Sequence, residues 1–458
     1  MAKEKNDLRI WVTYHKDSQI EEYGLREDKT HTLFASHKEV EGKNINHMNP
    51  VYSEMVTMWY VWKNNKKSTY VGFEHYRRHL ENVRLPKKGE CQVFNIVDFL
   101  YETVYDQYAR CHNKEDMDVM LQCVDSRYGT DNPYTRNIKE CHTLIANCTF
   151  VMRWQDFTKM CQFLFPLLDD FAAMFGISNT NVEEWRKKAV RDFGETPKTD
   201  YQTRILSFLA ERLISAWIMT HLLPYVDERI VAIVHYNTPN LLEKAIRSLR
   251  KNSPGCQVIV FDNSNRKPFK IKMAGVEVID NTRGQLIDFK KWLDTFPDKD
   301  TATKNDYASA KHCYTIQWLI DHIGKPFILM DSDVLVKHSL MSLYDAGKAF
   351  VGHIADDTYF QGFPLYRALP VLCYLNVPMM KEHGVAYFNP KKMWNLVGTA
   401  PEDHYDTGAS FLEEVKEKGL PYTKTDIRHY IDHMWHGSWV DDPDKEDKWL
   451  KEREVLWK

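Results

Sequence analysis

Short apolar runs and helical spacings alternate along the whole chain. In the first half, residues 8–13 and 69–73 have the apolar, aromatic and β-branched side chains of strands, and each run ends in a polar segment. Apolar side chains recur every three or four positions in residues 55–62 and again in residues 205–217, which predicts two helices. The charged residues 227–229 then interrupt the apolar pattern, and we expect a domain boundary there.

The second half begins with an uninterrupted apolar run, residues 230–234, which is typical of a buried parallel strand. Helical spacing follows in residues 241–249, and either Thr238 or Asn240 can cap that helix. The later elements are predicted to be strands at residues 257–261, 276–279 and 327–330 and a helix at residues 306–323. This alternation, with polar residues at the end of each strand, is the pattern of a doubly wound α/β nucleotide-binding sheet.

The length and composition of the chain indicate a globular protein with two domains. The 458 residues suffice for two ordinary domains, which we place at residues 1–227 and 228–458. Hydrophobic residues make up 43% of the chain, enough for a core in each domain. The formal net charge of -3 lacks the basic excess of a nucleic-acid-binding protein, so nucleic acid is not an expected partner.

Cysteine usage and the lack of membrane-directing segments favour a cytoplasmic protein. The 9 cysteines are irregularly spaced and form no C-x-x-C pair, so we expect reduced thiols rather than disulfides or zinc. The charged first residues are unlike a secretory signal, and the longest uncharged apolar stretch, residues 213–226, is shorter than the roughly 20 residues of a membrane span. Peripheral contact with the inner face of the cytoplasmic membrane stays open.

Two aspartates follow the last of the predicted strands. Asp331 and Asp333 stand one residue apart directly after residues 327–330, so the strand would place both carboxylates at its carboxyl end. Such a pair offers hard oxygen ligands to Mg²⁺ or Mn²⁺, and a cation there could neutralise the diphosphate leaving group of a nucleotide sugar. The alternative is that Asp-x-Asp is only a solvated turn or the start of a helix.

Four polar segments of the second half follow one another in a fixed order, namely residues 235–238, 262–264, 281–284 and 331–333. Together they resemble a family-two-type glycosyltransferase domain of the GT-A fold. The resemblance implies that Tyr236, Asn237 and Asp262 hold the uracil and ribose of a nucleotide sugar, with Asn281 in the same binding set. Acidic and amide side chains at strand ends can accept hydrogen bonds from these groups. The alternative for residues 262–264 is a simple turn.

The same resemblance implies a divalent cation, Mn²⁺ or Mg²⁺, in this domain. Asp333 is the first candidate ligand, and Asp331 would touch the ribose or reach the cation through water. GT-A enzymes often add a histidine that stands beside a glycine near the C-terminus. His436 matches that pattern best, and His433 is the alternative. Either histidine could instead be an ordinary packed or surface residue.

An inverting transfer also needs a base that takes the proton of the acceptor hydroxyl. The candidate is Asp406, at the predicted start of a helix, although Asp406 or Thr407 could simply be the N-cap of that helix. Lys311, on the helix before the Asp-x-Asp strand, could contact the diphosphate or be an ordinary solvated lysine.

Four segments of the first half are also informative, namely residues 52–55, 59–64, 70–78 and 211–213. They resemble a bacterial domain-of-unknown-function family, number 4422, whose members occur in capsule and O-antigen synthesis proteins. Some members are GT-A-like glycosyltransferases, including galactofuranosyltransferases. The resemblance implies a catalytic role for His75, Arg77 and Arg78.

Two adjacent arginines at the end of a strand offer fork-shaped donors to a diphosphate. No Asp-x-Asp follows an apolar strand in the first half, so Arg77 and Arg78 would neutralise the phosphates in place of a cation. The alternative is that Arg77 pairs with Glu54 or Glu211 in a buried structural network.

We therefore predict an α/β protein with two GT-A-like domains in tandem, both of the Rossmann-type, nucleotide-diphospho-sugar transferase kind. The expected function is that of a bifunctional glycosyltransferase that moves sugars from UDP-linked donors to a bacterial surface polysaccharide or a lipid-linked glycan. One rival interpretation keeps a single catalytic domain and makes the other half an acceptor-binding or scaffold module. A second rival is a carbohydrate-binding or scaffold protein whose Asp-x-Asp has no catalytic use.

Overall fold

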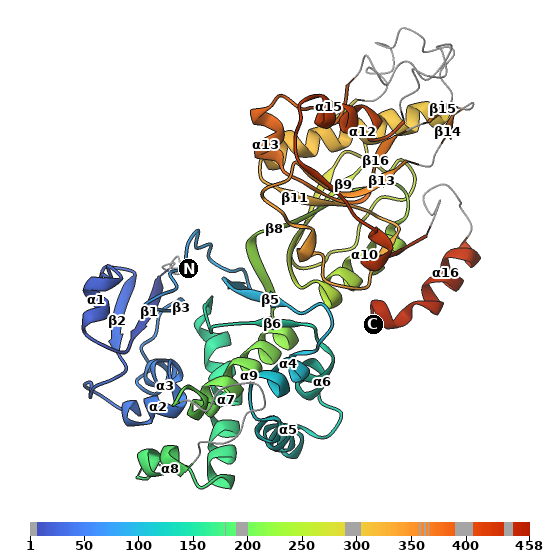
Figure 1. Cartoon of the computed structure of the whole chain (residues 1–458). Helices are drawn as coiled ribbons and strands as arrows, with labels where there is room; N and C mark the ends of the chain where they lie inside the picture. Colours follow the sequence, from blue (N-terminus) through green and yellow to red (C-terminus); the bar gives the residue numbers. More distant parts are fainter. Residues whose placement is uncertain are drawn as a thin grey trace, which may run out of the picture. The chain divides into compact units, whose positions relative to one another are not determined.

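The computed structural model describes residues 7–178, 180–188, 200–288, 304–356, 359–360, 363–364, 366–389, 406–434 and 443–458. Contacts between Cα atoms separate two compact units, Met1–Asp227 and Glu228–Lys458. Each unit consists of helices packed against a β-sheet, in agreement with the predicted α/β class (Figure 1).

The sheet of the first unit mixes parallel and antiparallel strands. Its strands are, in order across the sheet, β2 (His31–Ala35), β1 (Leu8–Tyr14), β3 (Tyr70–His75), β7 (Phe150–Arg153), β4 (Glu90–Val93) and the first residues of β8 (Leu223–His235). β1 is parallel to both β2 and β3, whereas β7 is antiparallel to β3 and β4. Because β1 and β3 run in the same direction, the residues that follow them emerge at the same edge of the sheet.

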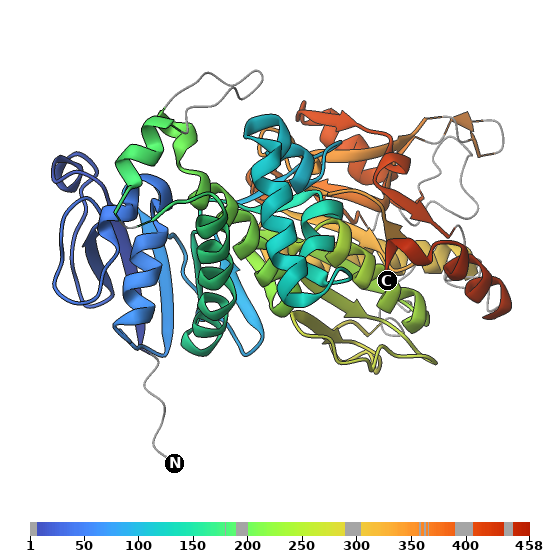
Figure 2. The ribbon, with the colours of Figure 1, turned by 90° about the horizontal axis from the view of Figure 1, so that it is seen from below.

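Helices cover this sheet unequally on its two faces. The helices of the unit are α1 (Ser18–Glu22), α2 (Asn49–Tyr52), α3 (Met55–Lys63), α4 (Val104–Cys111), α5 (Lys114–Tyr128), α6 (Pro133–Glu140), α7 (Trp154–Met174), α8 (Val182–Lys188) and α9 (Ile205–His221). Successive side chains of a strand face opposite sides, so Trp11 joins the large core under α3, α7 and α9, while Val12 joins a small cluster on the other face. α7 and α9 lie side by side (Figures 1 and 2).

The second unit has a doubly covered sheet. Its strands are, in order, β10 (Val276–Asp280), β9 (Gly255–Asp262), the later residues of β8, β11 (Phe327–Asp331), β16 (Arg367–Leu375), β13 (Phe350–Ala355) and β17 (Tyr422–Lys424). β11 is parallel to β8, and β10 is parallel to β9, whereas β16 is antiparallel to both of its neighbours.

The alternation of side chains along β11 explains why both faces are covered. Leu329 packs in the core that includes α12 (Lys304–Ile323), and Met330 packs in the core that includes α10 (Pro239–Asn252). Figure 1 shows these two helices on opposite sides of the strands. The other described helices of four or more residues in this unit are α13 (Val377–Glu382), α15 (Ala409–Glu417) and α16 (Pro443–Glu452).

The segment at which we predicted the domain boundary lies within a continuous strand. Residues 227–229 do not interrupt regular structure, because β8 runs through them from Leu223 to His235. Their side chains remain partly or fully exposed, and a strand tolerates charge at exposed positions as long as its backbone stays extended. Among the described helices, none combines the length and apolar character needed to cross a membrane.

Candidate functional site

The Asp-x-Asp segment lies between two strands of the second unit. Asp331 is the last residue of β11, and Asp333 directly precedes β12 (Val334–Val336). β12 pairs antiparallel with β18 (Ile431–His433), in a register that sets Val334 opposite His433. The backbone N–H of Met434 also donates to the Asp333 carbonyl oxygen at 2.9 Å. This pairing brings a histidine to the two aspartates from the far end of the unit.

Asp331, Asp333 and His433 form a cluster with the geometry of a cation site. Each offers one ligand atom, and these atoms all lie within 4.8 Å of one another. Two ligands of one hard divalent cation are separated by at most twice the metal–ligand distance, or about 4 to 5 Å. Two carboxylates and one imidazole suit Mn²⁺ or Mg²⁺, so the residues present fit the predicted cation.

The electrostatics of the cluster favour an added positive charge. Burial raises the pKa of the Asp331 carboxyl, and the nearby Asp333 raises it further. Burial opposes protonation of His433, but its hydrogen bond to Asp333, 3.2 Å from Nε2 to Oδ1, and the charges of both aspartates raise its pKa overall. Two close carboxylates thus attract a proton when no cation balances them.

Helix α12 adds a residue that sequence reasoning missed. The Nε2 atom of His312 lies 3.7 Å from the Asp331 carboxylate. His312 directly follows Lys311, which the sequence analysis had named as a candidate. Its position next to Lys311 on the predicted helix was the one signal that could have identified His312. The neighbouring Lys311 ammonium lies 4.9 Å from the centre of the Tyr236 ring, and burial lowers its pKa. Two predicted donor-site residues, Lys311 and Tyr236, are therefore in contact.

Asp262 has a different environment from that expected of a ribose ligand. Its side chain is only 2% exposed. One oxygen accepts from His235 Nδ1 at 3.0 Å and from the Ser264 N–H at 2.9 Å, and the other accepts from the Phe269 N–H at 2.7 Å. Although burial acts in the opposite direction, these donors lower the pKa of Asp262. Both carboxylate oxygens hold the loop after β9, which favours the turn alternative.

Asn237 and Asn281 are also occupied by internal hydrogen bonds. The Asn237 carbonyl oxygen accepts from the backbone N–H groups of Arg266 and Lys267, at 3.0 and 2.9 Å. The Asn281 amide donates to Asn263 at 2.9 Å, and its oxygen accepts from two backbone N–H groups. Both side chains thus hold the loops around the strand ends.

Asp406 is held by three partners. It forms an ion pair with Arg367, accepts from Ser309 Oγ at 2.9 Å and accepts from the Thr407 N–H at 2.6 Å. Neither Asp406 nor Thr407 is the N-cap of α15, because that position belongs to Gly408, whose φ is +80°. The N-cap alternative is therefore wrong, since the chain must first turn through a left-handed residue before the helix begins. A base at Asp406 would have to act from within its ion pair with Arg367.

The first-choice metal histidine, His436, lies outside the described residues. His433, the alternative, is the histidine that the structure brings to the aspartates. Thr238 occupies the N-cap position of α10 as expected, but its hydroxyl lies 3.2 Å from Ser332 Oγ and does not cap the helix.

The predicted arginine site of the first unit lies at the end of β3. His75 is the last residue of the strand and is 7% exposed. Arg78 donates from Nη1 to His75 Nε2 at 2.7 Å. Since an arginine can only donate, Nε2 is unprotonated and the imidazole is neutral. Burial and the charges of Arg78 and Arg77 lower the pKa of His75 to about 3, in agreement with a neutral ring.

Arg77 and Arg78 are both exposed, and the Arg77 guanidinium lies 5.0 Å from the Tyr76 ring centre. The buried network proposed as an alternative is different from the one observed. Glu211 pairs with Arg212 at 2.5 Å and accepts from the Asn147 N–H at 2.5 Å. Among the described residues, Arg77 has no ion pair with Glu54 or Glu211.

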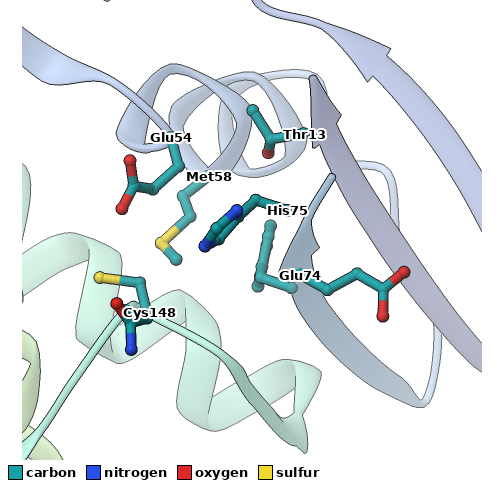
Figure 3. Close-up of a pocket in the computed structure, with 8 residues that line it drawn as sticks. Thr13, Glu54, Met58, Glu74, His75 and Cys148 are labelled. Carbon is teal, nitrogen blue, oxygen red and sulfur yellow. The ribbon is translucent and has the colours of Figure 1, made fainter. Parts of the chain in front are cut away.

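A small cavity opens beside His75 (Figure 3). Its lining comes from β1, β3, α3 and the loop after β6 (Thr143–Ile145), and includes Glu54, Met58 and Cys148. His15, just after β1, is a further polar residue at this edge of the sheet. Burial and the charge of Arg204 lower its pKa to about 4, and its ring is 2.7 Å from Ser36 Oγ. Arg204 was not predicted as part of a site, because it comes from the distant start of α9.

Comparison with known proteins gives one family match. A family model described as a domain of unknown function, DUF4422, matches residues 9–98 and 87–190. These residues lie in the first unit and amount to less than half of the chain. Curated protein sequences give no significant match.

Solved structures that resemble the chain are glycosyltransferases. The apo structure of the bifunctional glycosyltransferase WbbM is 15% identical, with a TM-score of 0.36, over 92% of this chain and 87% of its own. Mouse xyloside xylosyltransferase 1 is 13% identical, with a TM-score of 0.30, over 43% of this chain and 85% of its own. The galactosyltransferase LgtC, with donor and acceptor sugar analogues, is 14% identical, with a TM-score of 0.28, over 48% and 82%. Likeness at this level leaves the function to be argued from the sites themselves.

Proposed function

We propose that the chain is a bifunctional glycosyltransferase with one donor site in each unit. The unit Glu228–Lys458 would transfer a sugar from a UDP-linked donor with the help of Mn²⁺ or Mg²⁺. The unit Met1–Asp227 would carry out a second transfer in which arginines replace the cation. The acceptor would be a bacterial surface polysaccharide or its lipid-linked precursor.

The observation that carries this proposal is the cluster of Asp331, Asp333 and His433 at the carboxyl end of β11. Ligands in open α/β sheets bind outside the carboxyl ends of the strands, and a diphosphate leaving group needs charge neutralisation there. A bound divalent cation would supply that neutralisation. Tyr236 offers a ring for stacking on the base, and the Lys311 ammonium beside it offers a charge to the phosphates.

The second site rests on Arg77 and Arg78. Two exposed guanidinium groups at the end of β3 can form charge-assisted hydrogen bonds with both phosphates of a nucleoside diphosphate. His75 then acts as a positioning residue, because its Nε2 atom holds Arg78 in place. This differs from the catalytic role expected for His75 from the sequence, since its acceptor atom is already occupied.

The experiment is a UDP-release assay on the full chain with UDP-glucose, UDP-galactose, UDP-N-acetylglucosamine and UDP-galactofuranose, in Mn²⁺ or in EDTA. Asp333→Asn should abolish the Mn²⁺-dependent release and leave the EDTA-resistant release intact. Arg77→Ala should do the reverse. Matched controls are Asp447→Asn, at an exposed position of α16, and Arg136→Ala, whose side chain is 53% exposed.

The outcomes separate the three interpretations. If Asp333→Asn and Arg77→Ala stop the same single reaction, the two sites are not independent. If only Asp333→Asn has an effect, the first unit is an acceptor-binding module. A scaffold protein would release no UDP from any of the sugars and would show no thermal stabilisation by UDP with Mn²⁺.

A further inference from the structure

The cavity beside His75 contains one carboxyl group that has no role in the proposed binding of the diphosphate. Two glutamates line it, Glu54 and Glu74. Figure 3 shows the Glu54 carboxyl group on the side of Met58 and Cys148, whereas the Glu74 carboxyl group points away in the opposite direction. Glu74 is occupied there, because it accepts from the Leu80 N–H at 2.8 Å. Glu54 is thus the carboxyl group that belongs to the cavity.

The backbone around Glu54 is strained. Ser53, which precedes it, has a φ of +46°, and Asn147 and Cys148 on the cavity wall have φ values of +62° and +52°. Residues other than glycine rarely adopt a backbone conformation with positive φ. Its cost in free energy is tolerated only where the surrounding structure enforces the conformation. Ser53 directly follows α2 and Glu54 directly precedes α3, so the strained turn determines where the glutamate points.

Glu54 also differs from its neighbour Glu211 in its partners. Both oxygens of Glu211 are used, one by the Asn147 N–H and the other by Arg212. Among the described residues, no side chain donates a hydrogen bond to Glu54. Burial, and to a smaller extent Glu211, raises the pKa of Glu54 to about 7, although its own backbone N–H, which donates to the carboxylate, and the charges of Arg204 and Arg78 act in the opposite direction. A carboxyl group of this kind can exchange a proton near neutral pH.

Two other titratable groups of the cavity, His75 and Cys148, are unsuited to that task. His75 uses its Nε2 lone pair to accept from Arg78, and its pKa of about 3 makes the ring a poor proton acceptor. Cys148 is buried, and burial raises the pKa of its thiol well above the usual range. Within the described part of the chain, the one grouping of metal-ligating side chains lies in the other unit. Base chemistry in this cavity therefore falls to Glu54.

We propose that Glu54 is the general base of the first unit. Its carboxylate takes the proton of an acceptor hydroxyl while the hydroxyl oxygen forms a bond to the anomeric carbon of the donor sugar. The bond between that carbon and the phosphate oxygen breaks, and its electron pair leaves with the nucleoside diphosphate, whose charge Arg77 and Arg78 neutralise. This inference rests on the proposed function, namely that the first unit transfers a sugar.

The test uses the full chain carrying Asp333→Asn, which inactivates the second unit. It measures UDP release from each of the four UDP-sugars in EDTA, with water as the acceptor. Glu54→Gln should lower the release by about 100- to 10,000-fold, the usual contribution of a general base. It should change the UDP dissociation constant less than twofold. Glu115→Gln, at an exposed position of α5, is the control for loss of one charge.

The pH profile gives a second readout. The charged and titratable groups that face Glu54 are Glu211, Arg204, Arg78, Tyr201 and, in the cavity wall, Cys148 and His75. With its pKa of about 7, Glu54 passes from mostly protonated at pH 6 to mostly ionised at pH 8, so the release should rise about tenfold across that range and then level off. Glu54→Asp keeps the carboxylate but draws it back by one methylene, and should give an intermediate rate with the same type of profile.

Two results would overturn the role of Glu54 without affecting the proposed function of the first unit. One is a Glu54→Gln variant that keeps more than a tenth of the parent rate, and the other is a parent rate that is independent of pH. If the Asp333→Asn parent binds UDP but releases none from any donor in EDTA, the first unit is not a transferase, and the proposed function of that unit fails together with this inference. A melting curve shows whether each variant is folded. If Glu54→Gln does not fold, the activity of Glu54→Asp decides the question.

Discussion

His433 stands opposite Val334 in the pairing of β18 with β12, and its Nε2 atom lies 3.2 Å from the Asp333 carboxylate. The histidine and the aspartate are 100 residues apart in the sequence, so the pairing of two three-residue strands brings them together. The proposed cation site of the second unit therefore depends on a small sheet outside the main one.

Replacing His433 should weaken cation binding. In His433→Gln we expect the Mn²⁺ affinity to fall at least 10- to 100-fold, because even the loss of a group that only supports a ligand typically costs that much. Isothermal titration of the full chain with Mn²⁺ in the presence of UDP measures it. His383→Gln, an exposed histidine of the same unit, is the control. Full Mn²⁺ affinity in His433→Gln combined with a loss in His436→Gln would instead support the ligand predicted from the sequence.

The sequence predicted the strands of this unit better than the roles of the residues that follow them. An apolar run followed by aspartate was enough to locate β9, β11 and their polar ends. It was not enough to separate Asp262 from Asp333, because each lies at or within two residues of the end of a buried strand and both are nearly inaccessible. What distinguishes them is whether nearby backbone N–H groups use up the carboxylate, and that depends on loop conformation.

This difference predicts that Asp262 contributes to stability. Asp262→Asn should lower the free energy of unfolding by about 2 to 3 kcal/mol, because the new amide group faces an N–H donor in a buried loop. Asp280→Asn is a matched control, since Asp280 pairs with Asp262 across β9 and β10 but is exposed. Urea unfolding measures both. Equal losses in the two variants would contradict the structural role.

The pH dependence of this contribution follows from the lowered pKa of Asp262. A carboxyl group with a lower pKa in the folded state stabilises the protein above its unfolded pKa, and that stabilisation disappears as the pH falls through the folded value. The difference in the free energy of unfolding between the parent and Asp262→Asn should therefore be constant from pH 8 to about pH 5. It should shrink below about pH 4, the ordinary pKa of aspartate.

Gly408 should be needed for the loop that holds Asp406. Its φ is +80°, and a side chain at this position would collide with the carbonyl group of Ala368. The backbone N–H of Ala368 donates to the Gly408 carbonyl oxygen at 3.3 Å, which holds the two residues close together. Gly408→Ala should therefore cost more than the roughly 1 to 2 kcal/mol of left-handed backbone alone. Gly419→Ala isolates that backbone cost, because Gly419 has a φ of +63° and open space around it. Equal melting temperatures for the two variants would contradict the clash.

The first unit shows where sequence reasoning stops. The His-Tyr-Arg-Arg string directed attention to His75, Arg77 and Arg78, and the structure places all three at the end of β3. Glu54 was considered only as a partner of Arg77, because nothing in the sequence reveals that Ser53 is left-handed or that Arg212 takes Glu211. Such roles arise from competition among neighbours, which sequence spacing does not record.

Glu54 should destabilise the folded first unit at high pH. Its pKa is about 7 when folded and about 4.5 ordinarily, so the folded state binds this proton more tightly than the unfolded state. Stability is consequently lost as the pH rises from about 4.5 to 7, by up to about 3 kcal/mol from this one group. Glutamine has the shape of the protonated acid and never ionises. Glu54→Gln should therefore match the parent at pH 4.5 and melt at a higher temperature at pH 8, whereas Glu115→Gln should show no such difference between the two pH values. A Glu54→Gln variant that is less stable than the parent at pH 8 would mean that the ionised carboxylate has a stabilising partner. The strained turn at Ser53 would then position Glu54 for a structural contact and not for proton exchange.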